Sequence, residues 1–238
     1  MRIALLGYGK MGKAIEEIAL QRGHEIVLKV NEDNLGDFTK ENVTMADVAI
    51  EFTNPHSAFE NVKQTLGFGV PVVSGSTGWI EKIGEIESFC QQQNGSFLYA
   101  SNFSVGVNIF FELNKKLAAL MAPHEEYQVS MEEIHHTQKK DAPSGTAITL
   151  AEHVLELLPR KTKWVNDTVP AENELEIISK RIDPAPGTHI VKYSSAIDDI
   201  EIIHTAHNRK GFATGAVLAA EFIKDKKGIF SMKEVLGL

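Results

Sequence analysis

Short apolar runs alternate with longer stretches of helical period in the first hundred residues. The clearest helical stretch is Met11–Arg22, where apolar residues recur at three- and four-residue spacing, and Trp79–Gln93 is also predicted to be helical. Short strands that alternate with helices indicate parallel βαβ units, so we expect an α/β fold with a doubly wound parallel sheet. The predicted strands are Ile3–Leu6, Glu25–Val30, Asp47–Phe52, Val70–Ser74 and Ser96–Ala100.

The helix after the third of these strands carries its own start signal. Asn54 is a favourable N-cap residue, and Pro55 suits the first helical position because its missing N–H is not needed there. We therefore expect this helix to begin at Pro55.

The pattern changes after Phe103. Strand candidates now follow one another without intervening helices, which suggests a second, α+β domain with an open mixed sheet, most of it antiparallel. We place the first domain at residues 1–103 and 208–238, and the second at residues 104–207. The elements predicted after Phe103 are helices over Val105–Met121, Thr146–Leu158 and, as the final helix, Gly211–Lys224; strands over Tyr127–Ile134, Leu175–Arg181, Thr188–Ser195 and Ile200–Thr205; and a loop over Thr162–Glu174.

A glycine-rich turn joins the first predicted strand to the first helix. Its sequence fits the pattern G-x-G-x-x-G, and a second strand follows the helix, as a dinucleotide-binding turn requires. Glycines let the backbone turn tightly and approach a pyrophosphate, which rests on the helix N-terminus. We therefore predict cofactor contacts from Gly7, Tyr8, Gly9, Lys10, Met11 and Gly12.

An acidic residue about 20 positions further on is expected to bind the ribose. Glu32 lies 32 − 12 = 20 residues after Gly12, although Asn31 and Asp33 flank it and are alternatives. No arginine follows to neutralise a 2′-phosphate, which favours NADH. Lys10 and Lys29 keep NADPH open as the cofactor.

Two further predicted strands end in small or polar residues. In an open parallel sheet, ligands bind beyond the carboxyl ends of the strands, so these residues are candidates for contacts with the same cofactor. They are Gly75, Ser76 and Thr77 after the fourth strand, and Ala100, Ser101, Asn102 and Phe103 after the fifth.

The segment Glu133–Ala147 gathers most of the candidate chemistry. It holds two adjacent histidines, His135 and His136, and the lysines Lys139 and Lys140, and it leads into a helix capped by Ser144. A helix N-terminus favours anions, and histidine and lysine add positive charge and protons. The segment therefore predicts a site for a small anionic substrate that needs acid catalysis.

Composition narrows the class of protein. A net charge of −8 argues against binding to nucleic acid or to an anionic membrane. Cys90 is the single cysteine, so no internal disulfide can form, and we expect it to be a small buried residue. With no signal-peptide pattern and no apolar run long enough to span a membrane, we expect a cytoplasmic protein.

The run Glu133–Ala147, EIHHTQKKDAPSGTA, closely resembles the E-x-H-H-x-x-K-x-D-A-P-S-G-T-A signature of the dihydrodipicolinate reductase family, whose members are 4-hydroxy-tetrahydrodipicolinate reductases. The glycine turn, Gly75–Gly78, residues 100–108 and His207–Val217 also resemble the family. The resemblance implies a Rossmann-like domain, a mixed α/β substrate domain and a homotetramer. It further implies NAD(P)H-dependent reduction of 4-hydroxy-tetrahydrodipicolinate in diaminopimelate and lysine biosynthesis.

The resemblance also implies roles for individual residues. His135 would be the catalytic proton donor and Lys139 the second donor. His136, Lys139, Gly145 and Thr146 would bind the substrate carboxylates. The chain departs from the family in its shorter glycine turn and in Ser76, where threonine is commoner.

Other interpretations of the same residues remain open. A different NAD-dependent reductase would need a different substrate segment, and a nucleotide-sensing regulator would need a basic DNA-binding element, which is not visible. We expect no metal, because the His135–His136 pair has no cysteine or third clustered ligand beside it. Asp141 is expected to pair with a lysine, and His204, His207 and Arg209 are candidates for a second side of the site.

Overall fold

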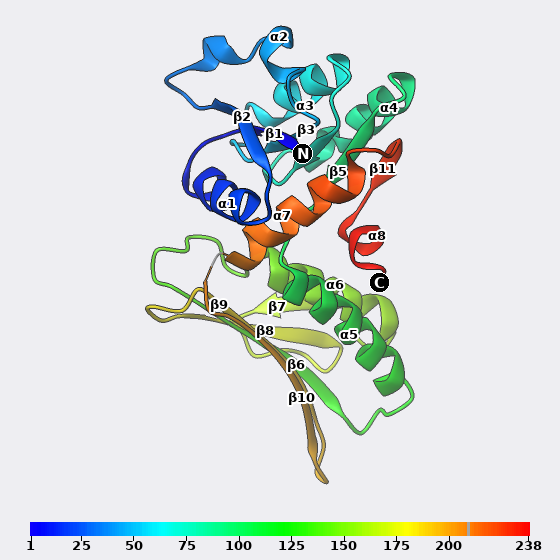
Figure 1. The fold of residues 1–238 in the computed structure, drawn as a ribbon. Coiled ribbons are helices and arrows are strands. Elements are labelled where there is room, and N and C mark those ends of the chain that lie inside the picture. Colours follow the sequence, from blue (N-terminus) through cyan, green and yellow to red (C-terminus); the bar gives the residue numbers. More distant parts are fainter. Residues whose placement is uncertain (209) are drawn as a thin grey trace. The chain divides into compact units, whose positions relative to one another are not determined.

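The computed structural model describes residues 1–208 and 210–238, and these form two compact units. The first unit contains Met1–Val105 and the C-terminal residues from 210 onwards, and the second contains Gly106–Asn208. None of the helices in the described residues is long and apolar enough to cross a membrane. Figure 1 shows the elements of both units.

The first unit is built on a six-stranded sheet in the order β11-β5-β4-β3-β1-β2, in which every pairing is parallel. This confirms the predicted doubly wound, Rossmann-like sheet. Its strands are β1 (Arg2–Leu6), β2 (Glu25–Val30), β3 (Val48–Glu51), β4 (Val72–Ser74), β5 (Ser96–Tyr99) and β11 (Gly228–Phe230).

Helices cover both faces of this sheet, because alternate residues of each strand point to opposite sides. Ile3 and Leu5 of β1 pack with one group of helices, while Ala4 and Leu6 pack with the other. The first group is α1 (Lys10–Gln21), α7 (Lys210–Ile223) and α8 (Met232–Leu236), and the second is α2 (Lys40–Val43), α3 (Ala58–Gly67) and α4 (Ile83–Gln92). Two short 3₁₀ helices, η1 (Leu35–Asp37) and η2 (Ile80–Lys82), complete the unit.

Two predictions in this unit were wrong. Helix α3 begins at Ala58 and not at Pro55, since the Asn54 side chain accepts hydrogen bonds from the His56 and Ser57 N–H groups and closes a turn before the helix. The helix predicted over Gly211–Lys224 is also not the last, because β11 and α8 follow it. These elements are short, and β11 forms only by pairing with β5 at the edge of the sheet.

The second unit has a five-stranded sheet in the order β10-β9-β6-β8-β7. Helices α5 (Val105–Met121) and α6 (Gly145–Leu157) share one apolar core with it. The strands are β6 (Gln128–His135), β7 (Lys163–Asn166), β8 (Glu174–Arg181), β9 (Gly187–Ser194) and β10 (Asp199–Ala206).

The sheet of this unit is mixed, which confirms the open mixed sheet expected for the second domain, although antiparallel pairs do not dominate it as the strand pattern suggested. The β10–β9 and β9–β6 pairs are antiparallel, whereas β6–β8 and β8–β7 are parallel. Helix α6 connects β6 to β7, and this helical crossover lets β7 and β8 run parallel to β6. Strand β7 lies inside the predicted loop Thr162–Glu174, and its four residues KWVN are too few to show a period.

Candidate active site

The glycine turn of the first unit has the close backbone contacts that its sequence predicts. Gly7 has φ of +95°, and a Cβ on Gly12 would lie 2.3 Å from the Gly7 carbonyl oxygen. No atom lies within 4 Å of the position where Gly9 would carry a Cβ. Gly7 and Gly12 are therefore required by the turn itself, whereas Gly9 leaves open space at the start of α1, where a phosphate is expected.

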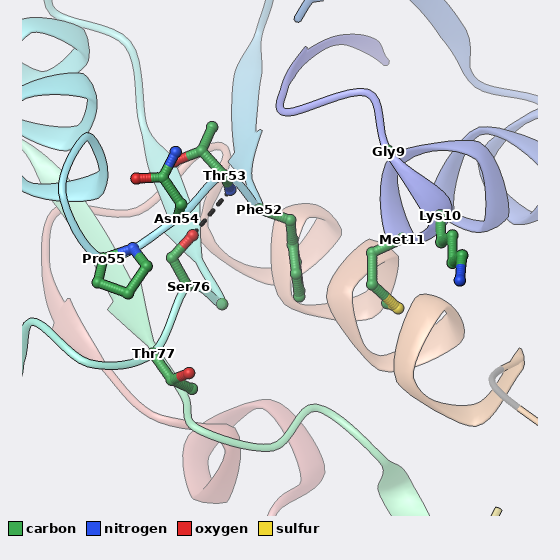
Figure 2. A pocket seen from close by; sticks show the side chains of 10 residues that line it. Gly9, Lys10, Met11, Phe52, Thr53, Asn54, Pro55, Ser76 and Thr77 are labelled. Carbon is green, nitrogen blue, oxygen red and sulfur yellow. Dashed lines mark hydrogen bonds between the residues drawn. The ribbon is translucent and has the colours of Figure 1, made fainter. Parts of the chain in front are cut away.

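A pocket of about 430 Å³ opens beside this turn (Figure 2). It is formed at the carboxyl ends of β3 and β4 and the start of α1, which is where a doubly wound sheet binds its ligand. Six predicted cofactor residues line it: Gly9, Lys10, Met11, Gly75, Ser76 and Thr77. The sequence prediction missed four others, all at the end of β3: Phe52, Thr53, Asn54 and Pro55.

A buried carboxylate supports one wall of the pocket. Glu51 is fully buried, and its Oε1 accepts hydrogen bonds from the Thr53 N–H at 2.8 Å and the Ser76 hydroxyl at 2.6 Å. Its Oε2 accepts a hydrogen bond from the Ser74 hydroxyl at 2.5 Å. The Ser76 hydroxyl also accepts from the Thr53 N–H, as the dashed line in Figure 2 shows. Glu51 thus joins the ends of β3 and β4, and the Ser76 hydroxyl is bound within the protein.

The other predicted cofactor residues do not line this pocket. Gly7 and Gly12 shape the turn, and the Tyr8 hydroxyl donates a hydrogen bond to Glu16. Glu32 is exposed in the turn after β2. The residues after β5 also lie outside the lining: Ala100, Ser101, Asn102 and Phe103.

Phe103 has a packing role in this unit. It is buried, its ring lies 5.5 Å from that of Phe52, and its carbonyl oxygen is so close to Gly215 that a Cβ there would lie 1.7 Å away. Trp79 is likewise buried, and its indole N–H donates to the Ser76 carbonyl, so it serves in packing. Cys90 is fully buried, as predicted.

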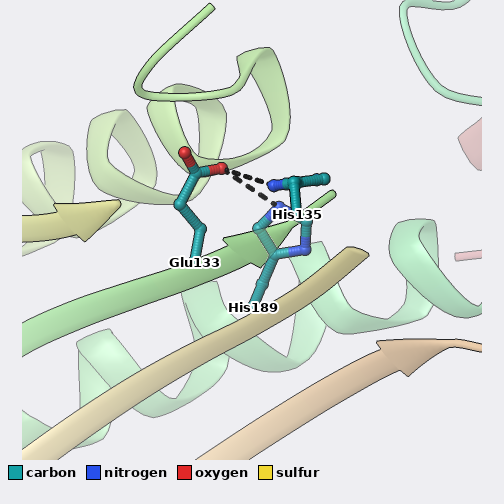
Figure 3. A group of neighbouring side chains, drawn as sticks. All are labelled: Glu133, His135 and His189. Atoms are coloured by element: carbon teal, nitrogen blue, oxygen red, sulfur yellow. Dashed lines mark ion pairs between the residues drawn. The ribbon is translucent and has the colours of Figure 1, made fainter. Parts of the chain in front are cut away.

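His135 is the last residue of β6 and is buried on the same face as Glu133, two residues earlier. Its Nδ1 lies 3.1 Å from Oε2 of Glu133. His189 on β9 packs edge-on against it, with ring centroids 5.1 Å apart, and the His189 Nε2 lies 3.9 Å from the same carboxylate oxygen (Figure 3). Glu133 and His189 were not predicted as site residues. The strand period offered a signal for Glu133, because it shares its face with Met131 and His135.

Three donors hold the other oxygen of Glu133. Oε1 accepts hydrogen bonds from the Arg181 guanidinium at 3.0 Å, the Ser179 hydroxyl at 2.9 Å and the Ser144 N–H at 3.1 Å. Burial acts to raise the pKa of Glu133, but the hydrogen bonds to His135 and to these groups outweigh it and hold the pKa far below its ordinary value. Glu133 is therefore an anion at neutral pH.

Burial also decides the charge of His189. It lowers the pKa of His189 to about 3, and the electrostatic effect of neighbouring His135 acts in the same direction. His189 is therefore neutral at neutral pH. Its Nε2 lies 3.2 Å from the Ser144 hydroxyl, which caps α6 by accepting from the Ala147 N–H.

The N-terminus of α6 lies next to this cluster. Ser144 is its N-cap, as predicted, and Gly145 is exposed, with no atom within 4 Å of its would-be Cβ. Thr146 follows in the first turn and is half-buried. The structure thus brings the predicted carboxylate-binding turn and the predicted proton donor to the same buried glutamate.

The loop after β6 carries the predicted lysine. Lys139 is half-buried and its ammonium pairs with Asp141, which confirms the prediction that Asp141 pairs with a lysine. Arg181 donates to the carbonyl oxygens of Lys139 and Asp141, so one guanidinium ties this loop to Glu133. His136 is half-buried, and Lys140 is exposed to solvent.

Two candidates for a second side of the site, His204 and His207, are not part of this cluster. His204 packs against Phe110 with centroids 5.9 Å apart, and burial lowers its pKa. His207 is exposed, and Arg209 lies outside the described residues.

The same cluster groups side chains of the kinds that bind metals. Among the described residues, ligand atoms of Glu133, His135 and His189 lie within 4.8 Å of one another. This is not the His135–His136 pair considered from the sequence. Because Arg181 already supplies a positive charge to Glu133, the cluster fits a proton-bearing imidazole better than a divalent cation. The absence of a metal stays a prediction.

Sequence comparison decides the family. The family model described as "Dihydrodipicolinate reductase, N-terminus" matches residues 1–103, and the one described as "Dihydrodipicolinate reductase, C-terminus" matches residues 106–236. The chain belongs to the dihydrodipicolinate reductase family. It is an oxidoreductase with the nicotinamide-binding domain of that family.

Individual relatives of this reductase are similar to it in sequence along almost its whole length. A 4-hydroxy-tetrahydrodipicolinate reductase of Christiangramia forsetii is 52% identical and covers 99% of this chain and 98% of its own. One from Methanosarcina acetivorans is 36% identical and covers 99% of this chain and 89% of its own.

A solved structure supports the fold of the reductase. The dipicolinate-bound dihydrodipicolinate reductase from Paenisporosarcina sp. TG-14 has a TM-score of 0.77 at 23% identity, and the match covers 98% of each chain. At this identity the likeness shows the fold alone.

Proposed function

We propose that this chain catalyses the NAD(P)H-dependent reduction of (2S,4S)-4-hydroxy-2,3,4,5-tetrahydrodipicolinate to tetrahydrodipicolinate, in which the 4-hydroxyl group leaves as water, in diaminopimelate and lysine biosynthesis. The observation that carries the proposal is the arrangement around Glu133. Its carboxylate contacts His135 directly and the N-terminus of α6 through Ser144. The relatives' names, and the dipicolinate bound to the Paenisporosarcina enzyme, favour a cyclic dicarboxylate as the substrate class.

In this proposal the residues of the second unit bind and protonate. Lys139, His136 and the first-turn residues Gly145 and Thr146 bind the two substrate carboxylates, because a helix N-terminus and an ammonium both attract anions. His135 gives the proton that the reduced ring nitrogen system needs, and Lys139 is the second donor. The nicotinamide, when bound, supplies the hydride.

The first unit is proposed to bind the dinucleotide. Residues 1–103 and 208–238 form this domain in the proposal, and residues 104–207 form the domain for substrate binding and assembly. The pocket lining and the open space at Gly9 support contacts from the glycine turn and from Gly75, Ser76 and Thr77. The proposal also keeps the four residues that follow β5, namely Ala100, Ser101, Asn102 and Phe103.

Either cofactor is proposed to serve, with NADH slightly favoured. Glu32 remains the proposed ribose partner. Lys29 pairs with Glu16 at 2.6 Å and is not left to neutralise a 2′-phosphate. Comparison of kcat/KM for NADH and NADPH in one assay tests the preference, and a clear excess for NADPH would contradict it.

The chain is also proposed to form a homotetramer in the cytoplasm. In the second unit, α5 and α6 share a core with one face of the sheet. Exposed Ile203 on β10 pairs with Ile190 on β9 and places apolar surface outside that core. Uncovered apolar sheet residues of this kind are suited to a subunit interface.

The catalytic assignment is tested with His135→Ala and Lys139→Ala, with exposed Lys140→Ala as the matched control. Loss of a general acid should cost about 10²–10⁴-fold in the rate of NADH oxidation with enzymatically generated substrate. The control should keep its activity. Near-wild-type turnover in both site variants would show that the assignment is wrong. Thermal-shift assays with NADH and pyridine-2,6-dicarboxylate should show stabilisation by each.

A further inference from the structure

Glu133 has no role yet in the proposed reaction, although it is the most enclosed charged group near it. It is fully buried, and its Oε2 faces Nδ1 of His135 at 3.1 Å. Both atoms are shielded from solvent, and neither has another hydrogen-bond partner among the described residues. When a buried acceptor and a buried donor have no other hydrogen-bond partner, the proton lies between the two atoms.

The carboxylate is well suited to hold this proton on the imidazole. Its second oxygen already accepts from Arg181, Ser179 and the Ser144 N–H, so the group is fixed in place and stays ionised. A fixed anion stabilises a proton on the facing nitrogen and stabilises the imidazolium.

The other groups around His135 do not compete for Nδ1. His189 on β9 is neutral and lies against the Ser144 hydroxyl. Arg181 on β8 is bound to Glu133, and Lys139 is paired with Asp141 in the loop after β6. His204 on β10 packs against Phe110, and its charge acts to lower the pKa of His189.

The opposite nitrogen of His135 lies beside Gly187, which carries no side chain. Nε2 lies 3.0 Å from the position where Gly187 would carry a Cβ, so a larger residue on β9 would press on this atom. With Nδ1 facing Glu133, Nε2 is the nitrogen left to give a proton to a substrate.

We infer that Glu133 is a positioning residue of the reductase. It keeps a proton on Nδ1 of His135, directs Nε2 towards the substrate, and fixes the N-terminus of α6 through Ser144. The Glu133 carboxylate thereby fixes the position of the proton donor, His135, relative to the turn that binds the substrate carboxylates. The inference rests on the proposed function, in which His135 is the proton donor.

The test compares Glu133→Gln with Glu132→Gln in the full chain. Glu132 is the adjacent residue, is half-buried, and pairs with Lys180 at 2.7 Å, so it controls for loss of a charge on the same strand. Glu133→Gln is expected to lower kcat/KM by about 10- to 100-fold, the usual cost of removing the group that orients a functional histidine. The alkaline limb of the kcat/KM profile should move to lower pH, because the anion no longer favours the protonated imidazole. Glu132→Gln should leave both unchanged.

A spectroscopic measurement keeps the inference testable if Glu133→Gln does not fold. In ¹⁵N NMR spectra of the wild-type protein above neutral pH, His135 should be the tautomer with hydrogen on Nδ1, its signals assigned by their loss in His135→Asn. The opposite tautomer would overturn the inference, as would an unchanged pH profile in Glu133→Gln. Activity that is lost to a chelator and restored by Zn²⁺ would also overturn it and show a metal site.

The two levels of proposal fail in different ways. Near-wild-type activity of His135→Ala would contradict the assignment of His135 as the proton donor, and with it the proposed mechanism. An inactive His135→Ala together with a wild-type profile for Glu133→Gln leaves the mechanism intact and removes only the role of Glu133.

Discussion

The ammonium of Lys139 is held by the carboxylate of Asp141, with Nζ 2.9 and 2.8 Å from its two oxygens. In the proposed reaction the same ammonium binds a substrate carboxylate, so the substrate competes with Asp141 for it. The Asp141 side chain is 60% exposed, and an exposed ion pair of this kind contributes at most about 1 kcal/mol. A substrate carboxylate can therefore displace Asp141 from the Lys139 ammonium.

Asp141→Asn should accordingly bind pyridine-2,6-dicarboxylate more tightly, because Lys139 no longer has to leave a carboxylate. The expected gain is up to about 5-fold in Kd, the equivalent of about 1 kcal/mol. Isothermal titration calorimetry measures it. Lys180 and Glu132 form an ion pair elsewhere in this unit, so Glu132→Gln serves as a control with no expected change. Weaker binding in Asp141→Asn would show that Asp141 supports the site in some other way.

The glycine turn allows two substitutions with opposite consequences. In Gly12→Ala the new methyl group would lie 2.3 Å from the Gly7 carbonyl, so stability should fall by about 1–3 kcal/mol, as in other overpacked sites. Gly9→Ala meets no atom within 4 Å and should keep the denaturation midpoint of the wild type. Its KM for NADH should rise, because the backbone must approach the pyrophosphate closely. Equal KM values for Gly9→Ala and wild type would argue against a phosphate at this turn.

His189 predicts a specific loss of stability in acid. Its pKa is about 3 in the folded protein, against 6.5 ordinarily, so the unfolded chain binds a proton that the folded chain does not. The stabilisation is complete above pH 6.5 and is lost as the pH falls from 6.5 towards 3, at up to about 1.4 kcal/mol per pH unit.

Urea unfolding between pH 4.5 and 7.5 tests this loss. His189→Gln cannot titrate, so its free energy of unfolding should fall less steeply with acid than that of the wild type. His124 has a side chain that is 54% exposed, and His124→Gln is the matched control with an unchanged slope. If the free energy of unfolding fell equally steeply with acid in the wild type and in His189→Gln, His189 would take up its proton in the folded protein as readily as in the unfolded chain.

The proposed tetramer predicts an effect at Ile203, which is 56% exposed on β10. Ile203→Lys places a charge in the proposed interface, and sedimentation velocity should show smaller species than the wild type. Leu35 is 66% exposed in the first unit, and Leu35→Lys should sediment as the wild type does. An unchanged assembly in Ile203→Lys would place the interface elsewhere.

Much of the architecture follows from local patterns in the sequence. Strand β2 and helix α5 have the bounds that their apolar periods predicted, because burial on a defined face is encoded residue by residue. The start of helix α3 could not be predicted from Asn54, since an asparagine can cap a helix or close a turn with the same hydrogen bonds. The four residues of β7 gave no period, and only their pairing with β8 makes them a strand.

The sequence by itself determined the two sheets' main elements, the glycine turn and the segment that carries His135, Lys139 and Ser144, because these depend on neighbours along the chain. Only the tertiary structure brought Arg181 and His189 to Glu133, from β8 and β9 on either side of β6. The register between strands decides which side chains share a buried space, and that register is fixed by packing across the whole sheet.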